Sequence, residues 1–352
     1  MIKYVIILTN LSLFFNLIKL KKFSFYNPMF SYRSILKKAL KTSWHYKYLW
    51  FFGLFATLVN PGGEYQILNK TIKEGLYGNF SGFFQSISST GIFSLKALSN
   101  MLGLMKANPI SALMSVIAVI LLLCLFGFIV WLAISSQGAI VSKIQKIEEE
   151  KGGDKPDFRA DLDKGSRSFW PIIGFNVLLK IGINFVFFLV SLPVILMLTN
   201  SLAFSILYVI LFILFIPVAI SLSLIAKYAI GFSVIKKTSF LDSLKKSWEL
   251  FLNNWIVSLE MAIALFSINI LASFAILIVI LIFPMPLFFV CLAMGKITIA
   301  WIVVLLVIIF MVISGSFLTT FQISAWTDLF LKINKGLGVS KVERLFKKKN
   351  KK

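Results

Sequence analysis

Long uninterrupted apolar segments determine what this chain can fold into. The clearest of them lie at about residues 110–135, 170–197, 202–226, 255–283 and 298–324. A helix of roughly 20 apolar residues crosses a hydrocarbon core of about 30 Å. Because lipid offers no hydrogen bonds, each segment must satisfy its own backbone polar groups, as a helix does. The sequence therefore predicts an all-α fold, a polytopic bundle of transmembrane helices.

Composition and charge argue against two other classes of protein. The chain is 59% hydrophobic and 14% charged, whereas a soluble domain is about half apolar and about a quarter charged. The formal net charge of +22 would suggest nucleic-acid binding in a soluble protein. Here the basic residues are mostly lysines, which lack the bidentate fork of arginine, and cytoplasmic loops of membrane proteins collect such residues. We therefore expect no nucleic-acid partner.

A sixth spanning helix is expected close to the N-terminal end of the domain. The apolar stretch "YLWFFGLFATLV" is short and spans the bilayer only if its helix begins near Trp44. Residues 1–28 contain another apolar segment. It is a short spanning helix, an uncleaved signal-like segment or the product of a misread start upstream of Met29. We assign residues 29–333 to a six-helix membrane domain and residues 334–352 to a basic tail.

Basic residues concentrate in every second connection between the predicted helices. They precede the first helix, fill residues 136–168 and the connection after Lys227, and recur in the C-terminal tail, whereas the connections near Asn200 and at 283–300 contain few. The positive-inside rule then predicts that both ends of the six-helix domain lie in the cytoplasm, in a cell (plasma) membrane. The loop at 61–108 lies outside, as an interfacial segment, a re-entrant segment or a lid.

The stretch "SFLDSLKKSWELFLNNW", which begins at Ser239, has the pattern of an amphipathic helix. Ser239 followed by Asp242 resembles a capping box with Asp in place of the usual Glu. Such a helix lies in the membrane interface, with its apolar side in the acyl boundary and its lysines among anionic headgroups. Its apolar residues recur on one helical face, and they are Leu241, Leu244, Trp248, Phe251, Leu252 and Trp255.

Three segments share one pattern: an aromatic residue, Leu four positions later, Lys six positions later and then a small residue. They are "YRSILKKA", "FRADLDKG" and "FLDSLKKS", and each comes just before a predicted spanning helix. The pattern predicts three hairpins, each preceded by a cytoplasmic amphipathic helix. The expected interfacial anchors are Tyr32, Leu36, Phe158, Leu162, Phe240, Leu244, Trp248 and Trp255.

The segments "KYLWFFGLFATLVNPGG" and "SFLDSLKKSWELFLNNW" resemble a broad group of bacterial six-helix membrane proteins. They are similar to the membrane domain attached to some glycerophosphoryl diester phosphodiesterases, over about residues 29–333. The resemblance implies six helices with both ends inside. The phosphodiesterase part of those fusions is a separate barrel with paired histidines and metal-binding acids. This chain has one histidine, His45, so we expect no enzyme activity, no metal and no cofactor.

A few polar residues interrupt the apolar segments. Lys180 and Glu260 are expected in the cytoplasmic half of the bilayer, where they form an intramembrane pair, reach the interface independently, or mark a substrate or proton path. Cys124 and Cys291 fit apolar packing better than a disulfide. The acidic stretch at 148–161 fits a solvated linker.

These features favour a non-enzymatic integral membrane protein, either an accessory or scaffold component or a lipid-associated regulator. Its expected partners are a bilayer with anionic headgroups and another membrane protein. The alternative is a transporter or permease component for a small solute or lipid. Transporters of known architecture place polar groups and broken helices in paired positions near the bilayer midplane, and this sequence has few of either.

Overall fold

The computed structural model describes residues 32–59, 109–149, 157–196 and 202–336. The N-terminal segment 1–28, the loop 61–108 and most of the tail 334–352 lie outside the described residues. The predictions for those segments therefore stay predictions.

Every regular element in the described part of the chain is a helix, and five helices there are long and apolar enough to cross a membrane. This confirms the multi-pass helical membrane class. The apolar helices are α3 (Leu49–Val59), α7 (Pro109–Glu149), α9 (Phe169–Leu196), α10 (Leu202–Lys236), α12 (Trp255–Ile282), α13 (Pro284–Ala293) and α14 (Ile297–Asn334). The shorter, more polar helices are α2 (Tyr32–His45), α8 (Phe158–Arg167) and α11 (Phe240–Asn253).

The first predicted span differs from the expectation. Trp44 lies in α2, and the apolar helix α3 begins only at Leu49. Its 11 residues rise about 17 Å at 1.5 Å per residue, which is short of the hydrocarbon core. The residues that follow Val59 lie outside the described part, so a sixth crossing stays a prediction.

Three of the long helices continue well past the predicted ends of their apolar segments. We expected ends near residues 135, 226 and 324, but α7, α10 and α14 continue to Glu149, Lys236 and Asn334. The apolar pattern shows where the lipid-compatible surface stops. It does not show where the helix stops, because Ala, Lys, Gln and Ile all continue a helix in polar surroundings.

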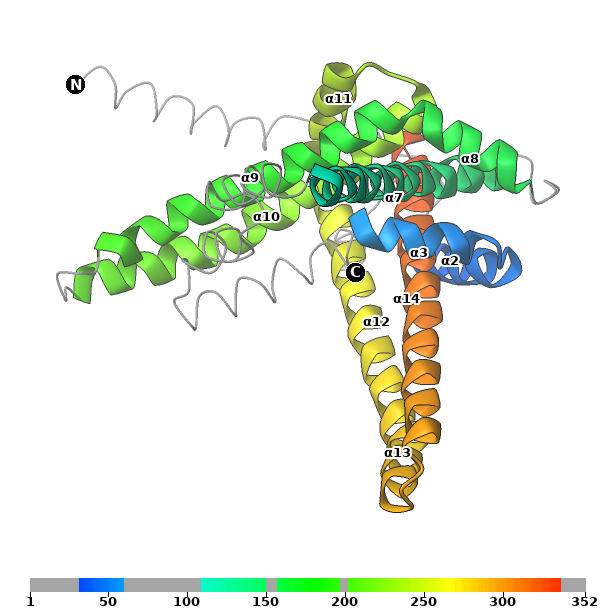
Figure 1. Ribbon diagram of the computed structural model, residues 1–352. Helices are drawn as coiled ribbons and strands as arrows, with labels where there is room; N and C mark the ends of the chain where they lie inside the picture. The colour runs from blue at the N-terminus through cyan, green and yellow to red at the C-terminus, as the bar shows by residue number, and fades with distance from the viewer. Residues whose placement is uncertain (1–31, 60–108, 150–156, 197–201, 337–352) are drawn as a thin grey trace, which may run out of the picture.

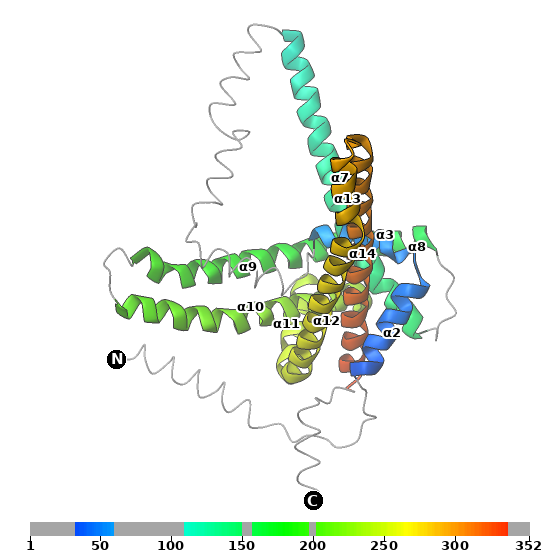
Figure 2. The same ribbon diagram turned by 90° about the horizontal axis from the view of Figure 1, so that it is seen from below.

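The long helices diverge from one shared region. Figure 1 shows the α9–α10 hairpin and the α12–α14 hairpin leaving this region in different directions, with α13 at the far tip of the second hairpin. Figure 2 shows the first half of α7 leaving it separately. We call the shared region the hub: the ends of α7, α10 and α14 from Ser135, Ser221 and Ser316 onward, with α2, α3, α8 and α11 around them.

Buried side chains concentrate in the hub, and exposed apolar side chains concentrate on the arms. Of the two large clusters of buried apolar residues, one joins hub helices with the near end of α12 and the other joins hub helices with the near end of α9. Away from the hub, large apolar side chains such as Leu121, Phe126 and Ile302 are more than half exposed. Such exposure suits a lipid solvent, because exposed apolar patches of this size are rare on soluble proteins.

The turn between α13 and α14 depends on a glycine. Gly295 has φ +69°, a left-handed conformation that L side chains rarely adopt. Its neighbour Lys296 donates its backbone N–H to the Cys291 carbonyl at 2.9 Å, which closes the end of α13. The chain can then reverse into α14 at Ile297.

Candidate functional site

The hub pairs each polar helix with the end of one long helix. α8 packs on α7, α11 packs on α10, and α2 packs on α14. The helix α3 packs on both α7 and α14. The first amphipathic helix in the chain therefore lies on the last long helix, which closes the arrangement into a ring.

The polar helices approach their partners through equivalent positions. In each of them, the residues three and seven positions after the helix start are buried. These residues are Ile35 and Ala39 in α2, Asp161 and Gly165 in α8, and Ser243 and Ser247 in α11. The small residues at the second of these positions, Ala39, Gly165 and Ser247, let one helix lie close to another.

Gly165 makes the closest of these approaches. A Cβ atom at Gly165 would lie 2.1 Å from the Ser135 carbonyl oxygen and 2.6 Å from the Ala139 nitrogen. Across the same contact, a Cβ at Gly138 would lie 3.0 Å from the Gly165 Cα. The backbones of α7 and α8 therefore touch here, and only glycine fits at position 165.

The first residues of two polar helices stack on apolar helices. The Phe158 ring stacks on Phe52 of α3 with centroids 4.7 Å apart, and the Phe240 ring stacks on Phe175 of α9 at 4.6 Å. Tyr32, the first residue of α2, packs against the buried cluster that includes residues of α12. The helices α8 and α11 thus also contact the apolar helix of the hairpin before them in the ring.

The predicted interfacial anchors fall into two groups. Half-buried side chains that pack against the hub clusters form the first group: Tyr32, Leu36, Leu162, Phe240 and Leu244. The second group is more exposed: Phe158 is 38% exposed, Trp248 50% and Trp255 51%. Contact of the second group with lipid stays a prediction.

The predicted cap of α11 takes a modified form. The Ser239 hydroxyl oxygen accepts a hydrogen bond from the Asp242 backbone N–H at 3.3 Å and donates one to the Asp242 carboxylate at 2.7 Å. In a full capping box the acidic side chain bonds the backbone N–H of the cap residue. Here Asp242 bonds the cap hydroxyl instead.

Lys180 and Glu260 lie on different arms of the molecule. Lys180 is exposed on α9, and Glu260 is half-buried on α12. Figure 1 shows that these two helices leave the hub in different directions. The proposed pair between them stays a prediction.

A buried ionic cluster joins α7, α8 and the turn before α3. Lys143 and Asp161 are both fully buried, with 3.7 Å between Nζ and Oδ2. The Tyr48 hydroxyl donates to the same Asp161 oxygen at 2.8 Å, and Lys146 lies 3.8 Å from the other oxygen. The ammonium of Lys143 also lies 5.5 Å from the ring centroid of Tyr46, a favourable cation–π position.

A second ionic cluster joins α2, α7 and α14. Asp328, which is almost fully buried, pairs with Lys332 at 2.9 Å and lies 4.0 Å from Lys38. Lys38 also pairs with Glu148 at the end of α7. Burial lowers the pKa of the Lys38 ammonium, and the carboxylate of Asp328 opposes this shift.

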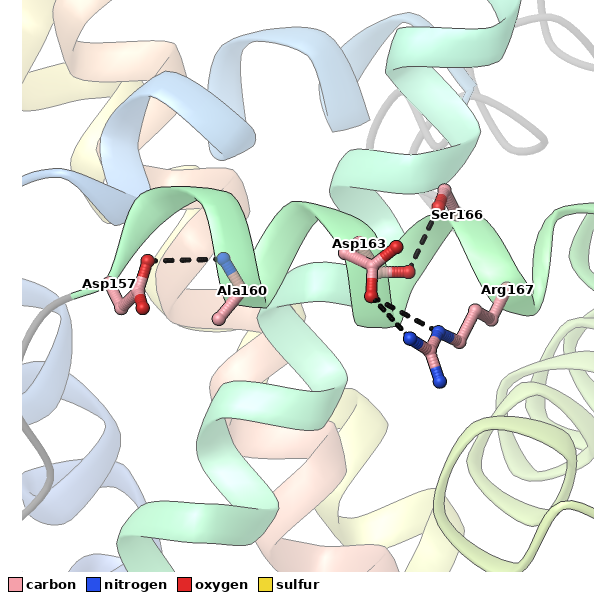
Figure 3. Close-up of polar contacts among 5 residues, drawn as sticks. All are labelled: Asp157, Ala160, Asp163, Ser166 and Arg167. Carbon is pink, nitrogen blue, oxygen red and sulfur yellow. Dashed lines mark hydrogen bonds and ion pairs between the residues drawn. The ribbon is translucent and has the colours of Figure 1, made fainter.

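Sequence reasoning missed both clusters. The acidic stretch at 148–161 was expected to be a solvated linker, but Glu148 pairs with Lys38 and Asp161 is buried. Residues 150–156 lie outside the described part. Figure 3 shows polar contacts along α8, whose first residues belong to the acidic stretch: the Asp157 carboxylate accepts a hydrogen bond from the Ala160 N–H at 3.1 Å, and Asp163 pairs with Arg167 at 2.7 Å.

A small pocket lies where α7, α10 and α14 meet. Its volume is about 30 Å³, and a cavity needs about 10–15 Å³ to hold one water. Each helix contributes two wall residues that are four positions apart and so share one helical face. The wall consists of Gln137, Val141, Lys227, Ile230, Gly231, Ile323, Trp326, Thr327 and Phe330.

The polar groups of the pocket are few and well placed. The Lys227 ammonium lies 4.5 Å from the ring centroid of Trp326. The Gln137 side chain is buried, and its oxygen accepts a hydrogen bond from Asn176 at 3.0 Å. The Thr327 hydroxyl donates to the Ile323 carbonyl at 2.7 Å. The polar groups of the wall are therefore one ammonium, one side-chain amide and one hydroxyl.

Metal and thiol chemistry have few candidate groups in the described part of the chain. No cluster there of three or more His, Cys, Asp or Glu side chains could hold a metal ion. Cys124 is exposed, Cys291 is buried, and both are free thiols.

No family model, no curated protein and no solved structure matches this chain.

Proposed function

We propose that this protein is a non-enzymatic scaffold or lipid-associated regulator of the plasma membrane. In this proposal the hub lies at the cytoplasmic surface and the apolar arms lie in lipid. The observation that carries it is the convergence of the ion-paired ends of α2, α7, α8 and α14 in one hub, while the arms expose mostly apolar side chains. By the positive-inside rule, this end of the molecule faces the cytoplasm.

The proposal includes a threefold internal repeat. Each unit has a polar helix, then an apolar helix, then a long helix that ends in the hub. Support comes from the equivalent buried positions of the polar helices, with Ala39, Gly165 and Ser247 in register. Further support comes from the ring, because each polar helix packs on the long helix of the preceding unit. A ring of this kind gives a stiff platform rather than a gated path.

The outer surface of the polar helices fits a membrane interface. On α11, Leu241, Trp248 and Leu252 are 43% to 73% exposed, and Lys245 and Lys246 are also exposed. Tryptophan favours the headgroup level, and lysines near an anionic surface each gain about 1 kcal/mol. This combination supports a bilayer with anionic headgroups as the partner of the polar helices.

Transport is less well supported than a scaffold. The pocket between α7, α10 and α14 holds about 30 Å³, which is room for only a few heavy atoms. The acidic groups Asp161 and Asp328 at the hub are neutralised by lysines of the same hub. A substrate path needs polar groups that engage the substrate, and these acids already pair with lysines of α2, α7 and α14.

Two experiments test the proposal. Reporter fusions after Gly82, Lys151, Lys237 and Lys352 should show cytoplasmic activity at the last three positions and external activity at the first. External activity at Lys151 or Lys237 would contradict the orientation. Purified protein in liposomes should transport nothing from a panel of small solutes. A solute flux that is abolished by Glu260→Ala would replace the scaffold with a transporter.

A further inference from the structure

We propose that one face of α9, which carries Asn176, Lys180 and Asn184, binds a transmembrane helix of another protein that presents a carboxylate to Lys180 and Asn184. This partner deepens the scaffold role proposed above and rests on it. The three residues are four positions apart, so they follow one another along one side of the helix.

The polar face of α9 is turned away from its neighbour in the hairpin. Figure 2 shows α10 running beside α9 along this arm. The side of α9 that packs on α10 carries Ile183 and Val186, which pack against the buried cluster at Phe215. Lys180 and Asn184, in contrast, are exposed. A partner helix can therefore reach the polar face without displacing α10.

The polar face begins at the hub and continues into the arm. At the hub, the Asn176 amide nitrogen donates to the Gln137 side-chain oxygen at 3.0 Å and to the Ile172 carbonyl at 2.9 Å. Further along the arm, Lys180 and Asn184 have no hydrogen bond or ion pair with any described residue. Only the first residue of the face is thus satisfied within the described part of the chain.

The arm is a costly place for two polar side chains. Every other residue at 177–186 is apolar or glycine, and polar side chains in spanning helices usually face other helices, where they pair. Lysine can extend its ammonium toward the membrane surface. The short side chain of Asn184 cannot do so, because it lies nine residues, or about 14 Å, past Phe175, the last buried side chain among the described residues of α9. Asn184 therefore needs a partner at its own level.

The chemistry of the face indicates an acidic partner. A lysine ammonium only donates hydrogen bonds, and a side-chain amide nitrogen also donates, so one carboxylate can accept from both. Asp161 and Asp328 pair with lysines inside the hub. Glu260 lies on α12, which leaves the hub in a different direction from α9 (Figure 1). We therefore expect the carboxylate to come from another molecule.

A different protein fits this face better than a second copy of the chain. Two copies related by a twofold axis present the same face to each other, so Lys180 would meet Lys180, and like charges oppose association. A helix with Asp or Glu within its apolar stretch has the complementary charge. Val177 and Ile181 are exposed beside the polar side chains and provide an apolar surface on which that helix packs.

The test uses designed peptides, because they fix the chemistry of the partner. Each peptide is a leucine-rich transmembrane helix of about 20 residues with Asp, Leu or Lys at its centre. The full-length protein is reconstituted in phosphatidylcholine vesicles, and energy transfer from a donor on the peptide to an acceptor on the protein measures association. The variants are Lys180→Met and Asn184→Leu. The control Ser267→Ala removes an exposed hydroxyl from α12.

We expect the Asp peptide to bind the wild type and Ser267→Ala equally. Lys180→Met and Asn184→Leu should each weaken this binding about tenfold, because a hydrogen bond between helices in lipid is lost. The Leu and Lys peptides should show only random transfer with the wild type. Lys180→Glu should reverse the preference and bind the Lys peptide. No binding of the Asp peptide to the wild type, or equal binding to Lys180→Met and Asn184→Leu, would overturn the proposal.

Two further measurements separate the site from other roles of the same residues. Lys180→Met and Asn184→Leu should keep the thermal unfolding midpoint of the wild type in detergent, and a fall in both variants would assign these residues to folding instead. Energy transfer between two labelled copies of the protein that Lys180→Met removes would identify a second copy as the occupant and overturn the choice of a different protein. The peptide assay measures association and the liposome assay measures flux, so a failure of this site is distinguishable from a failure of the scaffold role.

Discussion

Lys143 and Asp161 face each other inside the hub with both side chains fully excluded from solvent. Their charged atoms are 3.7 Å apart, and the Tyr48 hydroxyl completes the contact at 2.8 Å from the same carboxylate oxygen. Lys143 belongs to α7 and Asp161 to α8, so the pair fixes one helix on the other. Such a buried pair stabilises weakly when intact but costs much when broken, since one charge is then left without its partner.

Asp161→Ala should therefore reduce the free energy of unfolding by about 3–5 kcal/mol. Chemical unfolding in detergent, followed by circular dichroism, measures this change. The control is Asp163→Ala on the same helix, which removes the exposed pair with Arg167 that Figure 3 shows. An exposed pair contributes about 0–1 kcal/mol. Equal effects of the two variants would show that the Lys143–Asp161 pair is not buried in the folded protein.

Gly165→Ala tests the contact between the backbones of α7 and α8. The added Cβ would lie 2.1 Å from the Ser135 carbonyl oxygen, and a backbone atom cannot move aside as a side chain can. We expect a loss of at least about 1–3 kcal/mol, the usual cost of overpacking.

Gly127→Ala is the matched control for this substitution. Nothing lies within 4 Å of a Cβ at Gly127 in the described structure. Alanine favours a helix over glycine by about 1 kcal/mol, so this variant should be as stable as the wild type or slightly more stable. The prediction fails if Gly165→Ala is equally well tolerated in the same unfolding assay.

Much of the architecture could be predicted from the sequence, because lipid imposes a strong and local constraint. Apolar runs of sufficient length predict spanning helices one at a time, and α9 and α12 begin within a residue of the expected positions. The small residues Ala39, Gly165 and Ser247 were part of the predicted pattern. Their role in helix contacts was not, since a small side chain says nothing about what lies against it.

The hub itself could not be predicted in the same way. Counting basic residues treats each lysine as solvated, so Lys143 was assigned to a cytoplasmic loop although it is buried. The one signal available was Asp161, which occupies a position where the other two segments have Ile35 and Ser243. The pocket around Lys227 depends on how three distant helices meet, and no local pattern specifies that.

The stack of Phe240 on Phe175 predicts a measurable coupling between α11 and α9. Their rings lie nearly parallel, at 12°. Aromatic pairs contribute about 0.5–1.5 kcal/mol beyond the area that they bury. A double-mutant cycle with Phe240→Leu and Phe175→Leu should give a coupling energy in this range. A cycle with Phe240→Leu and Phe52→Leu should give none, because Phe52 stacks on Phe158 instead. Similar couplings in both cycles would contradict the specific pairing.

Trp248 tests whether α11 lies in the membrane interface. Its ring is half exposed next to Lys245 and Lys246, so in a bilayer it should be quenched by brominated lipids and shielded from aqueous quenchers. Trp326, which is buried in the hub, provides the reference for a tryptophan shielded from both. Each signal is obtained as the difference between wild type and the corresponding Trp→Phe variant.

Substitutions on this face of α11 should differ in how much stability or membrane attraction they remove. Trp248→Asp places a charge where an aromatic anchor was, and we expect a loss of the order of a few kcal/mol in bilayer-reconstituted protein. The paired change Lys245→Ala with Lys246→Ala should lose about 1 kcal/mol per lysine on an anionic membrane, and less at high salt, because salt screens exposed charges. If Trp248 is instead quenched freely from water in the reconstituted protein, this face of α11 does not contact lipid. The exposed Trp248 and its lysines would then form a surface for a soluble partner.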